Sequence, residues 1–132
     1  MAIQQILREW PPGYGGVERV AHELGHCWGG VVYSLDVQNR APSQQDALPV
    51  SYPRKRLCSV GVGGRLHVPL PCRSLISLLA SSEPLHGHLP SPGVLLVLVL
   101  ARLVRPSRIV TAHWHCFLKT TPGLSGFLFA LY

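Results

Sequence analysis

Apolar residues along the chain follow two different periods, which predict strands and helices in alternation. Ile3–Leu7 is a short apolar segment that predicts a first strand. In residues 17–24 the apolar positions recur at i, i+3, i+4 and i+7, which is the spacing of one helix face. A turn is expected at residues 26–30, and residues 31–35 predict a second strand.

The rest of the chain continues this alternation. Residues 38–49 are polar and predict a loop, and the glycine cluster at residues 60–64 predicts a second, flexible loop. Strands that alternate with helices predict an α/β domain, with a Rossmann-like, mostly parallel sheet flanked by helices. The further strands are expected within residues 50–57, which Pro53 interrupts, and at residues 108–111, and the further helices at residues 71–80, 93–104 and 123–132.

Residues 94–100 form the most apolar run of the chain, so a membrane span is an alternative interpretation. A helix over residues 93–104 rises about 18 Å, whereas the hydrocarbon core of a bilayer is about 30 Å thick. The run is therefore too short to cross. Because it is apolar on every side, it predicts a crossover helix buried between the sheet and its neighbours, although the alternation of Val and Leu also suits a strand.

Length, charge and cysteine content limit the class of protein. The 132 residues suffice for one domain and not for a two-domain enzyme. Twelve basic and six acidic residues give a net charge of +6, which favours anionic partners such as phosphates or an acidic membrane surface. The four cysteines include no C-x-x-C pair, which argues against a zinc ribbon. No signal-peptide pattern is present at the N-terminus, so a cytoplasmic protein with reduced thiols is expected.

A turn rich in proline and glycine separates the first strand from the first helix. Pro11 and Pro12 prevent regular structure, and Gly15 and Gly16 stand directly before the helix. A helix N-terminus without nearby side chains lets backbone N–H groups meet an anion. The turn therefore predicts a phosphate contact at Gly15 and Gly16, with a plain strand-to-helix connector as the alternative.

Two His-x-His pairs, His86/His88 and His113/His115, are the densest group of chemically versatile residues. Residues i and i+2 of a strand point to the same side, so four imidazoles could converge on neighbouring strands. One interpretation is a metal site, although zinc hydrolases with such pairs normally also use a carboxylate. The other is that these histidines line a cleft or hydrogen-bond the backbone.

Three motifs together resemble one enzyme family. The sequence PPGYGGVERV at residues 11–20 resembles the opening of family 4 glycosyltransferases, which are retaining enzymes with two Rossmann domains (the GT-B class). HGH at residues 86–88 is similar to the H-x-H end of a strand in that family, and IVTAH at residues 109–113 resembles its VVT-x-H motif. HWH at residues 113–115, with the apolar segment from Pro122 onward, resembles a bacterial subset of mannosyl- or rhamnosyltransferases.

The resemblance implies roles for the matching residues. His113 would be the catalytic histidine that faces the donor sugar, and Gly15 and Gly16 would contact the donor diphosphate. A GDP- or UDP-sugar would be a substrate, the acceptor would be a glycan or a lipid-linked molecule, and neither a cofactor nor a metal is implied. The residues expected to line the cleft on the acceptor side are Tyr14, His88 and His115.

The resemblance also implies a domain organisation. Residues 1–132 would be the N-terminal, acceptor-side domain, and the donor-binding domain with its paired glutamates would be absent. The chain alone is therefore expected to be inactive. Its place would be the cytoplasm, with peripheral contact at the inner face of the cell membrane, in the synthesis of cell-envelope polysaccharide.

Two other functions stay open at this stage. The basic triplet Arg54-Lys55-Arg56 predicts a solvated surface turn or, alternatively, an anchor for anionic lipid. A non-catalytic anion- or lipid-binding module is one alternative function, and a His-rich metal hydrolase is the other. Nucleic acid is not an expected partner, because no aromatic residues accompany the triplet and no nucleic-acid-binding motif surrounds it.

Overall fold

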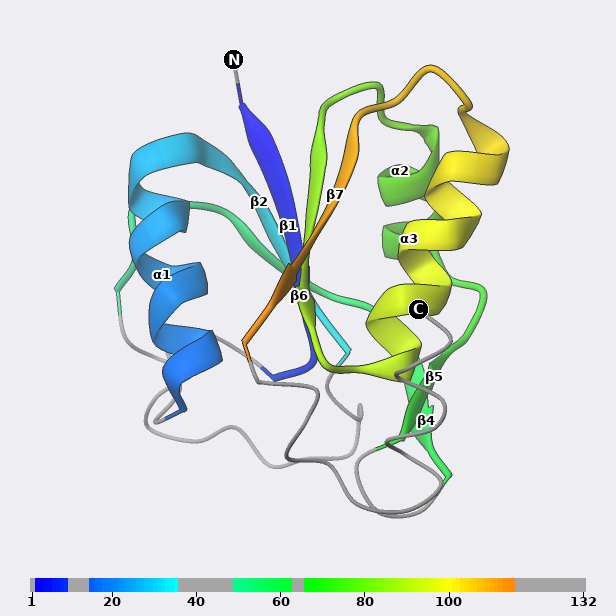
Figure 1. The fold of residues 1–132 in the computed structure, drawn as a ribbon, viewed down its shortest axis with the longest axis horizontal. Helices are drawn as coiled ribbons and strands as arrows, with labels where there is room; N and C mark the ends of the chain where they lie inside the picture. Colours follow the sequence, from blue (N-terminus) through cyan, green and yellow to red (C-terminus); the bar gives the residue numbers. More distant parts are fainter. Residues whose placement is uncertain (1, 10–14, 36–48, 63–65, 116–132) are drawn as a thin grey trace.

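The computed structural model describes residues 2–9, 15–35, 49–62 and 66–115. Five parallel strands form one sheet in the order β3-β2-β1-β6-β7 (Figure 1). The predicted α/β class with a Rossmann-like parallel sheet is therefore confirmed. The strands of this sheet are β1 (Ile3–Leu7), β2 (Gly29–Ser34), β3 (Arg54–Arg56), β6 (Leu85–Leu89) and β7 (Val110–Trp114).

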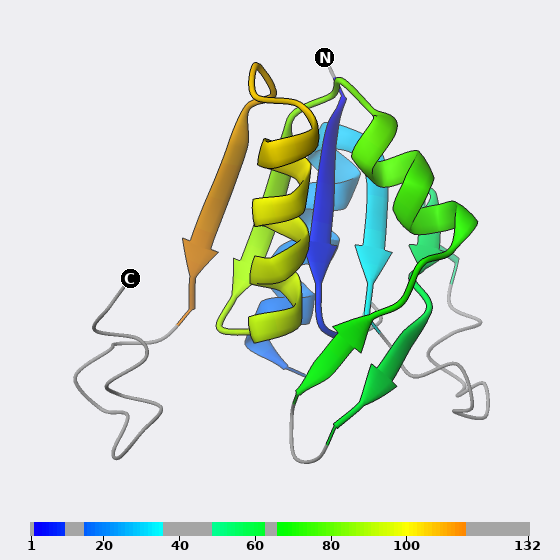
Figure 2. The same ribbon diagram turned by 90° about the vertical axis from the view of Figure 1, so that its right-hand side faces the viewer.

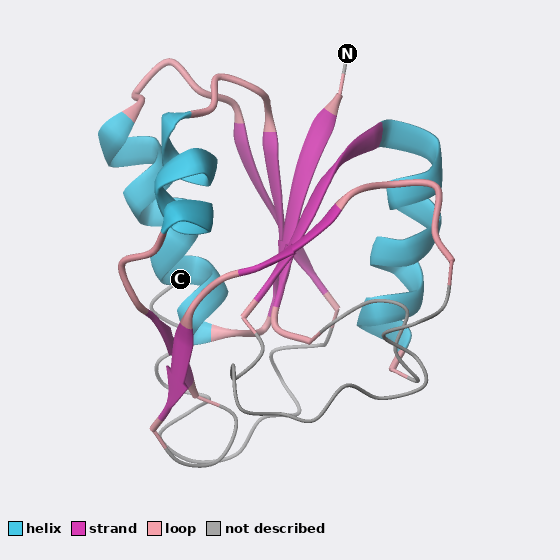
Figure 3. Cartoon of the chain, turned by 180° about the vertical axis from the view of Figure 1, so that it is seen from behind, coloured by secondary structure: helices cyan, strands magenta, loops and turns pink. Residues whose placement is uncertain are grey.

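Helices cover both faces of the sheet. Helix α1 (Gly16–Trp28) packs on β1 and β2 from one side. Helices α2 (Arg73–Ala80) and α3 (Pro92–Val104) pack together on the other side, as Figures 2 and 3 show. The result is a three-layer arrangement with β1 at the centre of the sheet.

The direction of strand addition reverses at β1. The chain first adds β2 and β3 on one side of β1, and then returns to add β6 and β7 on the other. In open α/β sheets, ligands bind outside the carboxyl ends of the strands at such a reversal. Helix α1 begins at that edge, because it follows the carboxyl end of β1.

The two faces of the sheet are covered very differently. A small apolar cluster lies under α1, and it consists of Leu7, Ala21, Val32 and Tyr52. The larger apolar core lies between the sheet and the α2–α3 pair: Ile6, Tyr33, Leu35, Leu57, Leu75, Leu78, Leu85, Leu89, Val94, Val97, Leu98 and Ala101. Most of the apolar burial in this part of the chain is therefore on the α2–α3 side.

The end of α1 differs from the prediction. A turn was expected at residues 26–30, but the helix continues to Trp28. Gly29 ends it with φ 66°, a left-handed conformation that glycine adopts without a steric penalty, and its N–H donates to the carbonyl of Gly25. Strand β2 follows at once, two residues earlier than expected.

Two segments that were predicted to be a loop and a turn contain strands. Residues 60–64 were predicted to be a loop, but Val60 and Gly61 belong to β4 (Ser59–Gly61), which pairs antiparallel with β5 (His67–Pro69), and residues 63 and 64 lie outside the described residues. The basic triplet was predicted to be a surface turn, but it forms β3 at one edge of the sheet, where Arg54 is paired with Val32, and this strand confirms the one expected within residues 50–57. A short segment becomes a strand where another strand pairs with it, and neither the glycine content nor the charge of these two segments shows that pairing.

Helix α3 confirms the predicted crossover helix, but the expectation that it is buried on all sides is wrong. Leu96, Val99 and Leu103 are 42%, 46% and 70% exposed. The opposite side, which includes Val94 and Val97, is fully buried against the sheet. Within the described ranges, no helix combines the length and apolarity that a bilayer crossing needs.

Some predictions lie outside the described residues. These are the cleft residue Tyr14, the loop over residues 38–48 and the helix at residues 123–132.

Candidate functional site

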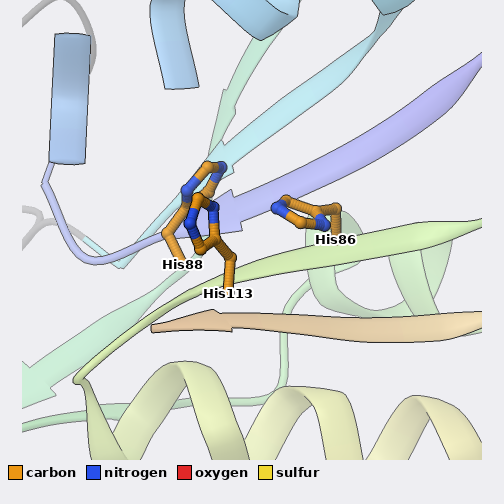
Figure 4. Close-up of side chains that lie close together, drawn as sticks. All are labelled: His86, His88 and His113. Carbon is orange, nitrogen blue, oxygen red and sulfur yellow. The ribbon is translucent and has the colours of Figure 1, made fainter. Parts of the chain in front are cut away.

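The His-x-His pairs lie on neighbouring strands, and the structure brings their imidazoles together. Strands β6 and β7 are parallel, and their register sets His88 beside His113. The imidazoles of His86, His88 and His113 lie on the side of the strands opposite α3 (Figure 4). Ring centroids are 5.0 Å apart for His86 and His88, and 4.2 Å apart for His113 and His115. The predicted convergence of four imidazoles is confirmed.

His88 is the buried centre of this histidine cluster (His86, His88, His113 and His115), with 1% exposure. Its Nε2 is 2.9 Å from Oε1 of Gln5, and Nε2 of Gln5 donates to the carbonyl of Ala21 at 3.3 Å. Because the Gln5 oxygen can only accept, the hydrogen of His88 is on Nε2 and its Nδ1 carries the lone pair. That Nδ1 is 2.9 Å from Nε2 of His115.

His86 has one satisfied and one unsatisfied nitrogen. Its Nδ1 is 2.7 Å from Oγ1 of Thr111, which lies on β7. The indole of Trp28, at the end of α1, meets the ring edge to face with centroids 5.2 Å apart. Nε2 of His86 is buried and has no hydrogen-bond partner. Such groups are uncommon in folded proteins, and each one calls for an explanation.

Burial favours the neutral form of three of these imidazoles, those of His86, His88 and His115. Desolvation, together with the neighbouring histidines, lowers the pKa of His88 to about 3. Burial and the nearby His113 and His115 also lower the pKa of His86, and burial and His113 lower the pKa of His115. Neutral imidazoles offer lone pairs, so the cluster can act as a set of ligands or hydrogen-bond acceptors at neutral pH.

The glycine turn begins α1 at the same edge of the sheet. Gly15 is the N-cap in an extended conformation, and no side chain caps the helix there. A Cβ on Gly15 would collide with the carboxylate of Glu18, so this carboxylate lies over the start of the helix. A Cβ on Gly16 would meet nothing within 4 Å. The space in front of Gly16 is therefore open, whereas that at Gly15 is partly occupied by a negative charge.

A cavity of about 120 Å³ connects the helix start with the histidine cluster. It lies at the carboxyl end of β6 and is therefore on the edge where the topology favours a ligand. His88 belongs both to the cavity wall and to the cluster. The residues that line the cavity are Arg8, Val17, Glu18, His88, Leu89 and Pro90.

Sequence reasoning missed the residues that orient the cluster. Gln5, Thr111 and Trp28 each contact one of its histidines. Arg8, which lines the cavity, was also not predicted. A signal for Gln5 was present, because two glutamines stand inside the short apolar strand at residues 3–7, where a polar side chain needs a buried partner.

A second histidine group lies on the exposed side of α1. Nε2 of His22 and Nε2 of His26, one helical turn apart, are 3.2 Å from each other. Nδ1 of His22 is 2.8 Å from the hydroxyl of Tyr52, and Nδ1 of His26 contacts the hydroxyl of Ser51. Burial raises the pKa of Tyr52 to about 12. Every imidazole nitrogen of this group has a partner.

Comparisons of the chain with protein-family models, with curated proteins and with solved structures find no match. The resemblance of the sequence motifs, the fold and the geometry of the carboxyl edge are therefore the basis for a functional proposal.

Proposed function

We propose that this chain is the acceptor-side domain of a glycosyltransferase that uses a nucleotide-sugar donor. In this proposal the donor diphosphate lies at the start of α1, against Gly15 and Gly16. His113 faces the sugar, and the acceptor, a glycan or lipid-linked molecule, enters from the side of His88 and His115. The proposal rests on the resemblance of the three sequence motifs to family 4 glycosyltransferases and on the geometry of the carboxyl edge.

One observation carries the proposal: Gly15 and Gly16 lie at the same carboxyl edge of the parallel sheet as His88, His113 and His115. His88 lies in the cavity wall with Val17 of the first turn of α1, and its ring centroid is 6.1 Å from that of His113. A helix N-terminus at a sheet reversal favours the charge of a diphosphate. The same dipole would stabilise the charge that develops as a nucleoside diphosphate leaves.

The size of the cavity supports an incomplete donor site. Sites for whole ligands have volumes of about 300–1,000 Å³, and this cavity has about 120 Å³. It would accept a phosphate group rather than a whole nucleotide-sugar. In the proposed enzyme a second Rossmann domain supplies most of the nucleotide contacts, so the chain alone is expected to transfer no sugar.

The carboxylate of Glu18 gives the sharpest test of phosphate binding. It lies over Gly15, where it would repel an incoming diphosphate. Glu18→Gln is therefore expected to tighten binding of UDP or GDP by about two- to five-fold, which corresponds to the effect of one charge at a helix N-terminus. Calorimetric titration of the full chain with each nucleotide, after treatment with a chelator, measures this change.

Glu23→Gln is the matched control, because Glu23 is an exposed residue of the same helix and its loss changes the net charge equally. It is expected to leave nucleotide affinity almost unchanged. Gly16→Leu is expected to block binding without disturbing the fold, since the space beside Gly16 is open. Equal effects of the two Glu→Gln changes, or nucleotide binding that survives Gly16→Leu, would contradict the proposal. Sugar transfer by the isolated chain would contradict the expected inactivity.

A further inference from the structure

We propose that His86, His88 and His113 form a binding site for a divalent transition-metal ion of the zinc class, held by one nitrogen of each imidazole. The site lies on the face of β6 and β7 and shares His88 and His113 with the proposed transferase site, but the inference rests on the positions of the imidazole nitrogens and not on the transferase function. It takes up the metal alternative that the sequence left open, with a ligand set that the strand register supplies.

The positions of the nitrogens are the first argument. One ligand nitrogen from each of the three residues lies within 4.8 Å of the other two. Bonds of about 2.0–2.1 Å from zinc to each imidazole place ligand nitrogens about 3.4 Å apart in a tetrahedral site. His113 is exposed, so a rotation of its side chain can bring the three nitrogens closer. The strand pairing of His88 with His113 holds the backbone in place for this.

The unpaired nitrogen of His86 is the second argument. Nε2 of His86 is buried without a hydrogen-bond partner, which is unfavourable in the metal-free protein. The other nitrogen of this ring already contacts Thr111. A metal ion bound at Nε2 would supply the missing interaction and would leave the contact with Thr111 intact.

The partners behind the ligands are the third argument. Histidines that bind metals usually donate their remaining N–H to a carbonyl, carboxylate or similar acceptor, which fixes the ring and the lone pair. Gln5 accepts from Nε2 of His88, and Ala21 holds Gln5 in that orientation. Nδ1 of His88 is thus the ligand atom, and on metal binding it exchanges its contact with His115 for the metal bond.

The donor set indicates the class of metal. Imidazole nitrogens suit zinc, copper, nickel and cobalt, whereas magnesium and calcium prefer oxygen ligands. Among the described residues, the three-residue group contains no carboxylate. Three neutral histidines leave the ion's charge of +2 uncompensated, and a fourth position is open to water or an anion, as in zinc sites with three histidines.

Direct metal titration tests the inference. The full chain, freed of any affinity tag and treated with a chelator, is titrated with zinc by calorimetry, and cobalt absorption reports the coordination geometry. One zinc ion per chain is expected, with the strong visible bands of tetrahedral cobalt. His86→Ala and His113→Ala are each expected to weaken zinc binding at least tenfold. His113 is exposed, so its variant keeps the fold, which circular dichroism verifies.

The double variant His22→Ala/His26→Ala is the matched control, because it removes two histidines from the exposed group on α1. It is expected to bind zinc as tightly as the original chain. Absence of stoichiometric zinc, unchanged affinity in both single variants, or loss of binding in the control would each overturn the inference. If the metal inference fails, the test of nucleotide binding is unaffected, because that test uses chelator-treated protein and Glu18→Gln.

Discussion

The parallel sheet buries polar side chains at its amino end and on the face of β6 and β7 opposite α3, but the two places differ in how completely those side chains are satisfied. At the amino end, the guanidinium of Arg108 is 2% exposed and donates three hydrogen bonds. Its acceptors are the carbonyls of Glu83 and Leu78 and the side-chain oxygen of Gln4, at 2.6–2.8 Å. The amide nitrogen of Gln4 in turn donates to the carboxylate of Glu83 at 2.8 Å.

On the face of β6 and β7 opposite α3, the histidine cluster has a buried nitrogen without a partner, on His86. In the network of Arg108, each guanidinium nitrogen has an acceptor, and this partnering stabilises the arrangement of strands. In the histidine cluster, Nε2 of His86 has no hydrogen-bond partner and therefore retains the capacity to bind a ligand. The comparison teaches that completeness of hydrogen bonding, rather than burial of polar groups alone, separates a structural site from a ligand site.

The largest expected effect is at the amino end. Arg108→Met removes the donor and leaves three buried or partly buried acceptors without it, so a loss of about 3 kcal/mol in the free energy of unfolding is expected. Urea unfolding followed by circular dichroism measures it. Zinc binding at the histidine cluster should persist under conditions in which the variant is folded.

Arg105→Met is the control for this prediction. Arg105 is exposed at the end of α3, and a surface change of this kind is expected to alter stability by less than about 0.5 kcal/mol. If the two variants lose the same stability, the network of Arg108 is not the anchor described above.

The histidine cluster should respond to metal in a way the Arg108 network does not. A ligand that binds only the folded state at 100 times its dissociation constant stabilises it by about 2.7 kcal/mol. Zinc at that excess is therefore expected to raise the free energy of unfolding of the original chain and of Arg105→Met by this amount. Chelator should reverse the effect, and His86→Ala should show almost none. An equal zinc effect in His86→Ala would mean that the ion stabilises the chain from another place.

The sequence contained enough to predict the alternation of strands and helices and the convergence of the histidines. Convergence follows from two local facts, the i, i+2 spacing within each pair and the position of both pairs on strands. The α3 crossover then makes β6 and β7 parallel neighbours. These are short-range patterns, which a single sequence displays directly.

The partners of the buried polar groups could not be predicted in the same way. Gln4 and Arg108 are 104 positions apart in the chain, and Gln5 and His88 are 83 apart. Residues 108–111 were predicted as a strand, and Arg108 instead precedes β7 and points into the amino-end network. Which distant acceptor meets a given side chain depends on the order and register of the strands, and no local pattern encodes these.

The smallest expected effect tests whether complete partnering also marks the histidines of α1 as structural. Tyr52→Phe removes the hydroxyl that contacts His22 and should lower stability by about 1 kcal/mol at neutral pH.

Since the pKa of Tyr52 is raised to about 12 in the folded chain, the folded state retains a proton that the unfolded state loses above pH 10. The original chain should therefore lose stability between about pH 10 and pH 12, and the variant should lose less over that range. Urea unfolding at pH 7, 10 and 11 measures the difference, and zinc affinity at neutral pH should be the same in both. A variant that loses zinc binding would show that a fully partnered group also serves the metal, and the distinction between the two kinds of site would fail.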